Sequence, residues 1–592
     1  MSSKKTSITS DLPLMEGDAA ILLEESIILK NDGELQEAEK KLHRIIVSPY
    51  QWTLDMGVCD KALALLCMLY RQRGAYKEII ECCSRFLEKV PNHINAYYFL
   101  GASYQVLGEN ELGLEQYTKV LELDPEHAAA YLNSGILFQR KKMFKQAIYH
   151  FKRAVEFDPE NVDVHFNLGA IQHNQGNFEA AMASYKRVLE LAPDNAYVCY
   201  MLADICEMTN SLSEAEQYLQ QGISLSPGHP LSYRLVATLL RRQGRIDDAI
   251  SRLEEAPVPS GDLQIDEAVH FEFGRLYERK QDSARAYAHY QAGNRLLSQR
   301  PGADHNDKDS YLNMVRQIRQ TYTPDWLATW TPPFETADQL MSPPTFLVGF
   351  PRSGTTLLDQ ILSSHSGIQV IEEQVMIANI RRELAPTPAG YLSALADLQP
   401  SRIQVLRQQY MDNAAHYLEE GKGGGIIDKL PLNIVHIGLI VRLFPDARII
   451  LALRHPCDVC LSCFMQAFGA NDAMANFYTL EDAARLYAEV MGLWRHYTNL
   501  LPLKYHQVRY EDIVENFEGE TRKLLGFLDL KWEPGVLEYN RHAGKRKHIN
   551  TPSYNQVTEK IYTRARYRWQ RYEDQLRPVA PMLSPFIDYF GY

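Results

Sequence analysis

Five prolines stand 34 residues apart in the first half of this 592-residue chain, and this spacing limits the folds that the region can adopt. They are Pro91, Pro125, Pro159, Pro193 and Pro227. Because proline cannot continue a helix, each one closes a unit of 34 residues. A unit of that length holds two antiparallel helices and their turns, so the period predicts a stack of helix pairs.

Small and large residues keep the same phase inside each unit. Gly101, Gly135 and Gly169 occupy one position of the period, and bulky residues recur at another position, beginning with Tyr117. Small residues let two helices approach closely, and the large ones fill the remaining space. The pattern resembles the tetratricopeptide repeat, so we expect residues 17–297 to form an all-α solenoid whose groove recruits an acceptor or a partner protein.

The phase of the repeats blurs outside residues 91–256, where we expect degenerate or capping helix pairs. A spacer or dimerisation arm without a ligand is the alternative to a binding groove. Clustered prolines and a polar run indicate that 298–342 is a linker with one short helix. The predicted order is therefore an N-terminal tail (1–16), the solenoid (17–297), this linker and a C-terminal domain (343–592).

The C-terminal domain opens with TFLVGFPRSGTTLLDQILS at Thr345–Ser363. An apolar run, a turn bounded by Gly349 and Gly354, and an amphipathic stretch predict a strand, a loop and a helix. Backbone N–H groups of such a loop and the positive end of the helix dipole attract an anion. The glycine spacing matches a Walker A loop, but Thr355 stands where that loop has its lysine. The sequence thus predicts a phosphate site that is not built for ATP or GTP hydrolysis.

Arg352 is the remaining fixed cation of this loop, which resembles the loop of sulfotransferases that use 3′-phosphoadenosine 5′-phosphosulfate (PAPS). The octet GFPRSGTT, followed by Glu372 and Glu373, is most similar to the tyrosylprotein sulfotransferases and their bacterial relatives. The resemblance implies an α/β P-loop-like domain with a mostly parallel sheet. It also implies that the loop residues bind PAPS, namely Arg352, Ser353, Gly354, Thr355 and Thr356.

Glu373 follows Arg352 at the offset at which the tyrosylprotein sulfotransferases carry their catalytic glutamate. Sulfuryl transfer to a hydroxyl needs a base that takes the acceptor proton, and we expect Glu373 to be that base. Glu372 is then an orienting or competing carboxylate. His365 is the alternative base, although capping of the loop helix is the favoured role for it. Two solvated acids that open a helix are the alternative for the glutamate pair.

Two further positions follow predicted buried strands, where ligands bind in doubly wound sheets. Lys429 follows the run Gly425–Asp428, and the resemblance gives it a role at the leaving phosphate or the bridging oxygen. Arg454 ends the predicted strand Arg448–Leu453, and Ser462 comes shortly after it. In PAPS enzymes such a pair holds the 3′-phosphate, a group that ATP lacks.

The resemblance alone suggests two more contacts to the nucleotide. Tyr510 stands at the tip of a predicted strand, and Ser553 lies in a late segment that matches relatives in part. Residues 541–571 carry nine Lys and Arg against one acid. This excess predicts an anion clamp or, alternatively, a solvated positive face.

Cys457, Cys460 and Cys463 repeat at a spacing of three on one predicted helix. No fourth cysteine follows at ligand spacing, so the pattern favours a packing stripe over an iron–sulfur site, and we expect no metal. The nine cysteines show no disulfide framework, and the absence of a secretory signal favours a cytoplasmic location. A net charge of −12 argues against general nucleic-acid binding, and no apolar run predicts a membrane span.

The sequence therefore predicts a PAPS-dependent sulfotransferase domain joined to a repeat solenoid. We expect Arg352 and Lys429 to stabilise charge on the leaving group while Glu373 accepts the proton. The alternatives are a P-loop kinase acting on a small molecule, which the missing lysine disfavours, and a non-catalytic repeat scaffold. The acceptor hydroxyl, on protein tyrosine or on another molecule, and the oligomeric state stay open.

Overall fold

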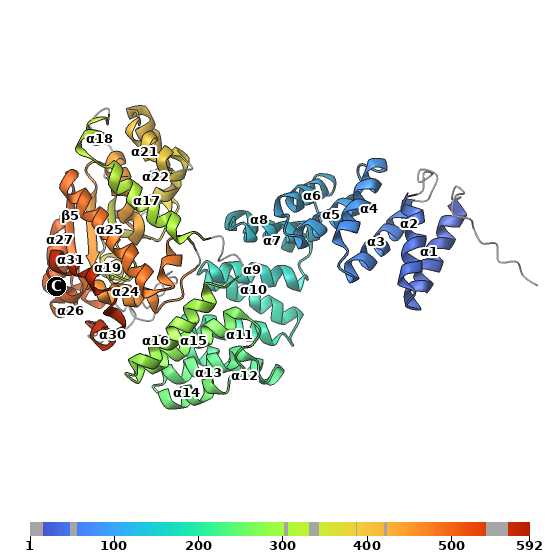
Figure 1. The fold of residues 1–592 in the computed structure, drawn as a ribbon, viewed down its shortest axis with the longest axis horizontal. Helices are drawn as coiled ribbons and strands as arrows, with labels where there is room; N and C mark the ends of the chain where they lie inside the picture. Colours follow the sequence, from blue (N-terminus) through green and yellow to red (C-terminus); the bar gives the residue numbers. More distant parts are fainter. Residues whose placement is uncertain are drawn as a thin grey trace, which may run out of the picture. The chain divides into compact units, whose positions relative to one another are not determined.

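The computed structural model describes residues 16–47, 56–300, 306–330, 343–385, 388–419, 423–469, 471–539 and 566–592 (Figure 1). The chain divides into two compact units, Met1–Val198 and Cys199–Tyr592. The division falls inside a repeat helix, so the repeats contribute to both units. The predicted domain boundaries after residues 297 and 342 are not tested by this division and stay predictions.

The first unit consists of antiparallel helix pairs joined by short turns, drawn from blue to turquoise in Figure 1. The pairs are α1 (Glu16–Asn31) with α2 (Leu35–Val47), α3 (Met56–Gln72) with α4 (Tyr76–Lys89), α5 (Ile94–Val106) with α6 (Asn110–Leu123), α7 (Ala128–Arg140) with α8 (Phe144–Phe157), and α9 (Val162–Asn174) with α10 (Phe178–Leu191). The prediction of an all-α repeat array is confirmed.

The second unit continues these pairs before the α/β domain begins. Its repeat helices are α11 (Ala196–Met208), α12 (Leu212–Leu225), α13 (Pro230–Arg242), α14 (Ile246–Glu254), α15 (Leu263–Arg279) and α16 (Ser283–Leu297). Two helices follow in the predicted linker, α17 (Lys308–Thr321) and α18 (Pro324–Ala328). Trp330, just beyond α18, is buried under the guanidinium of Arg442, 5.0 Å from its ring. This part of the segment thus packs on the α/β domain.

Glycine on one helix and an aromatic ring on its partner explain how closely the paired helices approach. A Cβ atom added at Gly101 of α5 would lie 2.7 Å from the ring of Tyr117 on α6. In the pair of α11 and α12 the roles are reversed. Tyr200 of the first helix covers Gly222 of the second, and an added Cβ would lie 2.6 Å from the ring. Space for a side chain is absent at both glycines.

Five strands form one parallel sheet in the order β2-β3-β1-β4-β5. They are β1 (Thr345–Gly349), β2 (Ile368–Glu372), β3 (Gly425–Lys429), β4 (Arg448–Leu453) and β5 (Lys504–Arg509). In a parallel sheet all carboxyl ends meet at one edge, and ligands bind at that edge. The prediction of an α/β domain with a mostly parallel sheet is confirmed.

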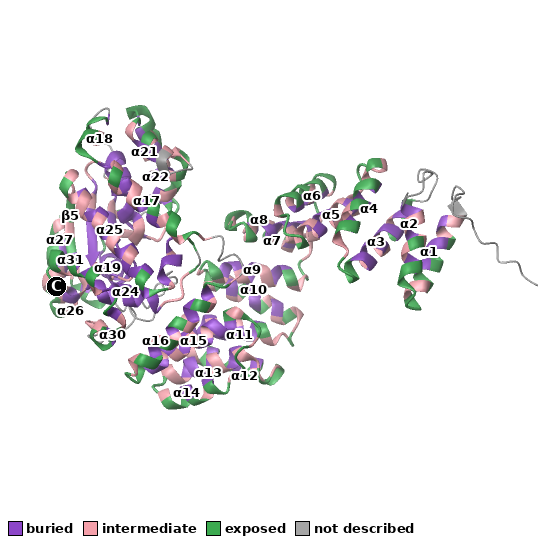
Figure 2. Cartoon of the chain, in the orientation of Figure 1, coloured by how far each residue is buried: buried purple, intermediate pink, exposed green. Residues whose placement is uncertain are grey.

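The central strand β1 is buried on both faces, as its apolar run predicts. Phe346 and Val348 belong to one hydrophobic core, whereas Leu347 packs in a second core with Leu358 and Ile361 of α19 (Thr355–Ser363). This alternation follows from the two-residue period of a strand. Helices therefore cover both faces of the sheet, and Figure 2 shows buried residues concentrated there.

The remaining helices connect the strands or follow the sheet. Between β2 and β5 lie α20 (Met376–Leu384), α21 (Pro388–Ala396), α22 (Pro400–Ala415), the 3₁₀ helix η3 (Pro431–His436), α23 (Ile437–Leu443), α24 (Pro456–Phe464), η4 (Met474–Phe477) and α25 (Leu480–Leu500). After β5 come α26 (Tyr510–Glu515), α27 (Phe517–Phe527), η5 (Pro534–Glu538), η7 (Arg568–Tyr572), α30 (Glu573–Leu576) and α31 (Ala580–Phe590).

Candidate active site at the carboxyl ends of the strands

All five strands deliver predicted site residues to the same edge of the sheet. The loop follows β1, a glutamate pair ends β2, and a lysine is the last residue of β3. The residues directly after β4 and β5 complete the set. In chain order, the residues brought together at this edge are Arg352, Glu373, Lys429, Arg454 and Tyr510.

The loop between β1 and α19 has the shape of an anion cradle. Arg352 and Gly354 have positive φ angles of 70° and 102°. The N-cap residue Gly354 has no side chain that could cap α19, and within the described part of the chain the buried hydroxyl of Ser353 makes no hydrogen bond. A Cβ atom at Gly349 would lie 2.6 Å from the carbonyl oxygen of Ala452. The tight turn thus leaves helix N–H groups and one hydroxyl available to an anion.

The loop is fastened to α24. Arg352 Nε donates to Ser462 Oγ over 3.1 Å. The Sγ of Cys463 donates to the carbonyl oxygen of Pro351 over 3.3 Å. The sequence predicts that Ser462 acts with Arg454, and the structure adds a direct bond between Ser462 and the loop arginine.

Arg454 lies between an aromatic ring and a buried carboxylate. Its guanidinium is 5.0 Å from the centre of the Tyr510 ring, and its Nη2 is 3.7 Å from Asp458 Oδ2. Both contacts stabilise and orient a cation. The same tyrosine ring would lie 3.2 Å from a Cβ atom at Gly354. Tyr510, suggested by the resemblance alone, thus lies against both the loop and Arg454.

Several residues behind Arg454 were not predicted. Asp458 Oδ1 accepts a hydrogen bond from the backbone N–H of Trp569 over 2.8 Å, and Glu511 Oε1 accepts one from the N–H of His455 over 3.0 Å. The rings of His455 and Trp569 stack 4.8 Å apart. Burial lowers the pKa of His455 to about 4, so this ring is neutral at pH 7. The C-terminal segment therefore supports the strand end that carries Arg454.

Lys429 lies fully buried among three carboxylates. Its Nζ is 3.0 Å from Glu373 Oε1, 3.1 Å from Glu372 Oε1 and 3.9 Å from Asp359 Oδ2. Burial by itself would lower the pKa of Lys429, but the three carboxylates together raise it above its ordinary value. The ammonium group therefore stays protonated. Asp359, on α19, was not predicted from the sequence.

The two glutamates beside Lys429 differ in exposure and in backbone conformation. The side chain of Glu373 is 32% exposed and that of Glu372 is 14% exposed. Glu373 has a φ angle of 52°, and its N–H donates to the carbonyl oxygen of Lys429 over 2.7 Å. Positive φ is uncommon for glutamate and often accompanies a functional site. The pair ends β2 and contacts a cation, so the alternative of solvated acids opening a helix is wrong.

Comparison with protein families recognises both halves of the chain. Residues 343–534 match the sulfotransferase family, and residues 94–127, 143–176 and 174–239 match tetratricopeptide repeat models. The chain carries tetratricopeptide repeats and a sulfotransferase domain. The resemblance that the loop and the 34-residue period indicated is confirmed.

Relatives of the sulfotransferase domain include named tyrosine sulfotransferases. The chain is 23% identical over 262 residues to a putative protein-tyrosine sulfotransferase of Caenorhabditis briggsae (42% of this chain, 88% of that protein). It is 24% identical over 271 residues to protein-tyrosine sulfotransferase 1 of Danio rerio (41% and 71%). An uncharacterized protein of Aquifex aeolicus is 26% identical over 381 residues, covering 63% of this chain and 48% of that protein. The chain thus spans about half the length of the Aquifex relative.

Solved structures similar to part of the chain include MamA and a TPR protein. The crystal structure of MamA is 21% identical with a TM-score of 0.26, covering 26% of this chain and 91% of that one. YrrB, described as a TPR protein with an unusual peptide-binding site, is 22% identical with a TM-score of 0.29 (32% and 97%).

His365 lies at the opposite edge of the sheet from the candidate active site of the sulfotransferase domain. It follows α19, whose nine residues span about 13 Å. Its Nδ1 accepts from the N–H of Gly367 over 3.0 Å, so Nε2 carries the proton and donates to the carbonyl oxygen of Lys531 over 2.8 Å. Both ring nitrogens bond to loop backbone. The prediction that His365 is an alternative base is wrong, as is its predicted role as a helix cap.

Ser553 and residues 541–565 of the basic segment lie outside the described residues. The three arginines of the segment that are described all pair with acids: Arg566 with Glu515 at 2.8 Å, and Arg568 and Arg571 with Glu278 at 3.0 and 3.8 Å. In this described part of the segment the arginines bind carboxylates and do not form the predicted anion clamp.

The cysteines of α24 serve packing. Cys457, Cys460 and Cys463 are all buried, and burial raises the pKa of each thiol. Among the residues placed by the structure, no cluster of three or more His, Cys, Asp and Glu side chains could hold a metal ion. Across the same residues, no helix has both the length and the apolar composition that crossing a membrane requires.

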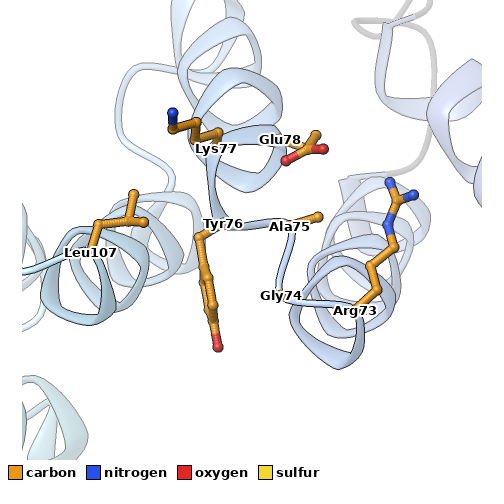
Figure 3. A pocket seen from close by; sticks show the side chains of 7 residues that line it. All are labelled: Arg73, Gly74, Ala75, Tyr76, Lys77, Glu78 and Leu107. Carbon is orange, nitrogen blue, oxygen red and sulfur yellow. The ribbon is translucent and has the colours of Figure 1, made fainter.

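A hollow in the first unit lies at the turn between α3 and α4. Figure 3 shows side chains of Arg73, Tyr76 and Leu107 around it, which come from the ends of α3, α4 and α5. Its volume is about 360 Å³, and Lys77 and Glu78 add charges of both signs to its lining. The mixture of one ring, one aliphatic side chain and three charges favours no particular ligand.

Proposed function

We propose that this protein transfers a sulfuryl group from PAPS to the hydroxyl of an acceptor. The observation that carries the proposal is the buried Lys429, 3.0 Å from the partly exposed carboxylate of Glu373, at the strand edge that holds the anion cradle. This edge combines a fixed cation, a reachable base and a phosphate-binding loop. Those are the groups that an in-line transfer from an anionic donor requires.

The residues at this edge fit the two ends of PAPS. The uncapped start of α19 and the hydroxyl of Ser353 suit the 5′-phosphosulfate. Arg454, held by Tyr510 and Asp458, offers a forked donor to the 3′-phosphate, with Ser462 as the second donor. The site lacks the Walker lysine, and this supports PAPS over ATP as the donor.

PAPS supplies an activated sulfuryl group, whose bond to the phosphate oxygen breaks as the acceptor oxygen bonds to sulfur. Glu373 removes the proton of the acceptor hydroxyl, because its carboxylate is the more exposed of the pair. Protonation of Glu373 weakens its ion pair with Lys429. The ammonium group then turns toward the leaving oxygen, where it stabilises developing negative charge together with Arg352. No step requires a metal ion.

The repeats are proposed to recruit the acceptor or a partner protein. Repeat arrays of this kind present extended binding surfaces, and the relatives named protein-tyrosine sulfotransferase support a protein acceptor. The nine cysteines, all buried and within the described residues, form no disulfide bond, and this supports the reducing cytoplasm expected from the sequence.

The test is binding of the product nucleotide to the full-length protein. At about 100 times its dissociation constant, 3′,5′-ADP should stabilise the native state by roughly 2.7 kcal/mol in thermal unfolding. Arg454→Ala should remove this effect. Arg448→Ala, at the other end of β4, is the matched control and should keep it. Stabilisation by ATP–Mg²⁺ alone would favour the kinase, and no response to either nucleotide would favour the scaffold.

Turnover completes the test, with radiolabelled PAPS and a panel of tyrosine peptides, saccharides and phenols. Transfer of label to at least one hydroxyl is expected, and Glu373→Gln should abolish it. Binding of 3′,5′-ADP without transfer to any acceptor class would leave a nucleotide-binding repeat protein rather than an enzyme.

A further inference from the structure

The last repeat pair, α15 and α16, packs against the helix that carries Ser462. At the carboxyl end of α24, the buried Asn294 of α16 donates from Nδ2 to the carbonyl oxygen of Phe464 over 2.7 Å. The ring of Tyr287 stacks on the ring of Phe464, 4.9 Å between centres. The last carbonyl groups of a helix lack partners within the helix, so Asn294 satisfies one of them.

The same pair reaches the amino end of α24 through the C-terminal segment. Glu278 of α15 accepts a hydrogen bond from Arg568 over 3.0 Å. The next residue, Trp569, donates its backbone N–H to Asp458 over 2.8 Å. Asp458 lies in the first turn of α24, and its other oxygen is 3.7 Å from Arg454. A continuous chain of contacts thus joins the repeats to the proposed 3′-phosphate arginine.

These contacts are sufficiently shielded from solvent to hold the C-terminal segment and α24 in a fixed arrangement. The side chains of Arg568 and Glu278 are 14% and 20% exposed, and Asp458 is fully buried. Burial by itself would lower the pKa of Arg568, but Glu278 and Asp458 raise it, so the guanidinium stays charged. Removing one partner of a buried pair leaves the other charge uncompensated, and the segment then has to move. Trp569, stacked on His455, would move with it.

We propose that the last repeat pair positions α24 for nucleotide binding, with Asn294 and Glu278 as its positioning residues. The inference rests on the proposed function, in which Arg454 and Ser462 hold the 3′-phosphate. Asn294 acts through Phe464, and Glu278 acts through the segment that contains Arg568. The repeats are then part of the donor site, in addition to any role in recruiting an acceptor.

Two variants of the full-length protein test the proposal. Asn294→Leu removes the donor to Phe464 while keeping the side-chain volume, and Glu278→Gln removes the charge opposite Arg568. Each should weaken binding of 3′,5′-ADP, measured by calorimetry, about fivefold. The KM for PAPS should rise by a similar factor while kcat changes less, because the proton acceptor and Lys429 stay in place.

Matched controls come from the same group of helices. Gln291→Leu changes an exposed residue of α16, and Asp247→Asn removes an exposed carboxylate that pairs with Lys280. Both should bind 3′,5′-ADP within about twofold of the unsubstituted protein.

Hydrogen exchange of α24 without ligand separates this inference from the proposed function. Amides of Cys457–Phe464 should exchange about fivefold faster in Asn294→Leu than in Gln291→Leu. Unchanged exchange together with unchanged nucleotide affinity would overturn the positioning role. Failure of the unsubstituted protein to bind 3′,5′-ADP would instead overturn the donor site, and faster exchange in Asn294→Leu would still support positioning of α24 by the repeats.

Discussion

Replacing Lys429 with methionine probes the buried charge cluster directly. Methionine keeps the unbranched apolar stem but lacks the ammonium group. The contacts of 3.0, 3.1 and 3.9 Å to Glu373, Glu372 and Asp359 are then lost together. Asp359 is fully buried and cannot regain water, so its charge stays without the cation that compensated it.

The loss of stability expected for Lys429→Met follows from the burial of the ion pairs that it removes. Removing one partner of a buried ion pair destabilises a protein by about 3–5 kcal/mol. The partial exposure of Glu373 and Glu372 lets them rehydrate, so we expect the lower end, about 3 kcal/mol at neutral pH. The raised pKa of Lys429 means that its stabilisation is present at neutral pH and is lost only as pH rises through the folded-state pKa.

Lowering the pH should reduce the loss of stability that Lys429→Met causes. Without the cation, the carboxylate charges repel one another and Asp359 stays buried, so adding protons reduces the penalty, and the loss of stability at about pH 5 should be smaller than at about pH 7.5. Urea unfolding at both pH values measures it, with Lys504→Met as control. Lys504 pairs with Asp446 at 2.6 Å but is 57% exposed, and its loss should cost less than about 1 kcal/mol. Equal deficits in the two variants, or no relief on acidification, would refute the reasoning.

Three further outcomes are expected. In urea, the free energy of unfolding of Glu373→Gly should be about 1 kcal/mol higher than that of Glu373→Ala, because φ is 52° at this position and glycine adopts that angle without strain. Equal free energies of unfolding would argue against backbone strain. Burial raises the pKa of Asp428 to about 7, although the hydroxyl of Tyr410 lowers it. Ionised Asp428 therefore destabilises the fold, and the stability gain of Asp428→Asn should grow between about pH 4 and 7; a pH-independent difference would contradict this. Gly349→Ala should weaken 3′,5′-ADP binding about tenfold, because its Cβ would lie 2.6 Å from a β4 carbonyl oxygen. Gly526→Ala, with open space around it, should bind normally, and equal affinities would show that the turn tolerates a side chain.

Local patterns predicted the strands that are long, apolar and bounded by charge. The predicted strand Arg448–Leu453 has the same bounds in the structure, since an apolar run between arginines permits little else. The strand β2 was not predicted. Its burial does not alternate strictly, and it is defined by pairing with β3, where Glu372 lies opposite Lys429. Tertiary pairing of that kind leaves no local pattern.

Individual site residues were predictable, but their neighbours were not. Asp359 sits in the apolar run of α19, and nothing in that sequence separates an acid facing Lys429 from one facing solvent. Asp458 poses the same problem. Spacing along the chain paired Ser462 with Arg454, whereas its bond to Arg352 depends on how α24 crosses the loop. Contacts between segments more than 100 residues apart can be identified only once the fold is known.

The reversed packing of Tyr200 on Gly222 limits how this array can change by recombination. A constant 34-residue period suggests interchangeable modules that duplication or exchange could lengthen or shuffle. A graft of α10 onto α12 would place the equivalent of Val188 at position 222, where a Cβ atom lies 2.6 Å from the tyrosine ring. Exchange of single helices is therefore blocked here. Each whole helix pair contains both the aromatic ring and the glycine that it covers. Whole pairs are therefore the smallest segments that can be exchanged without repacking.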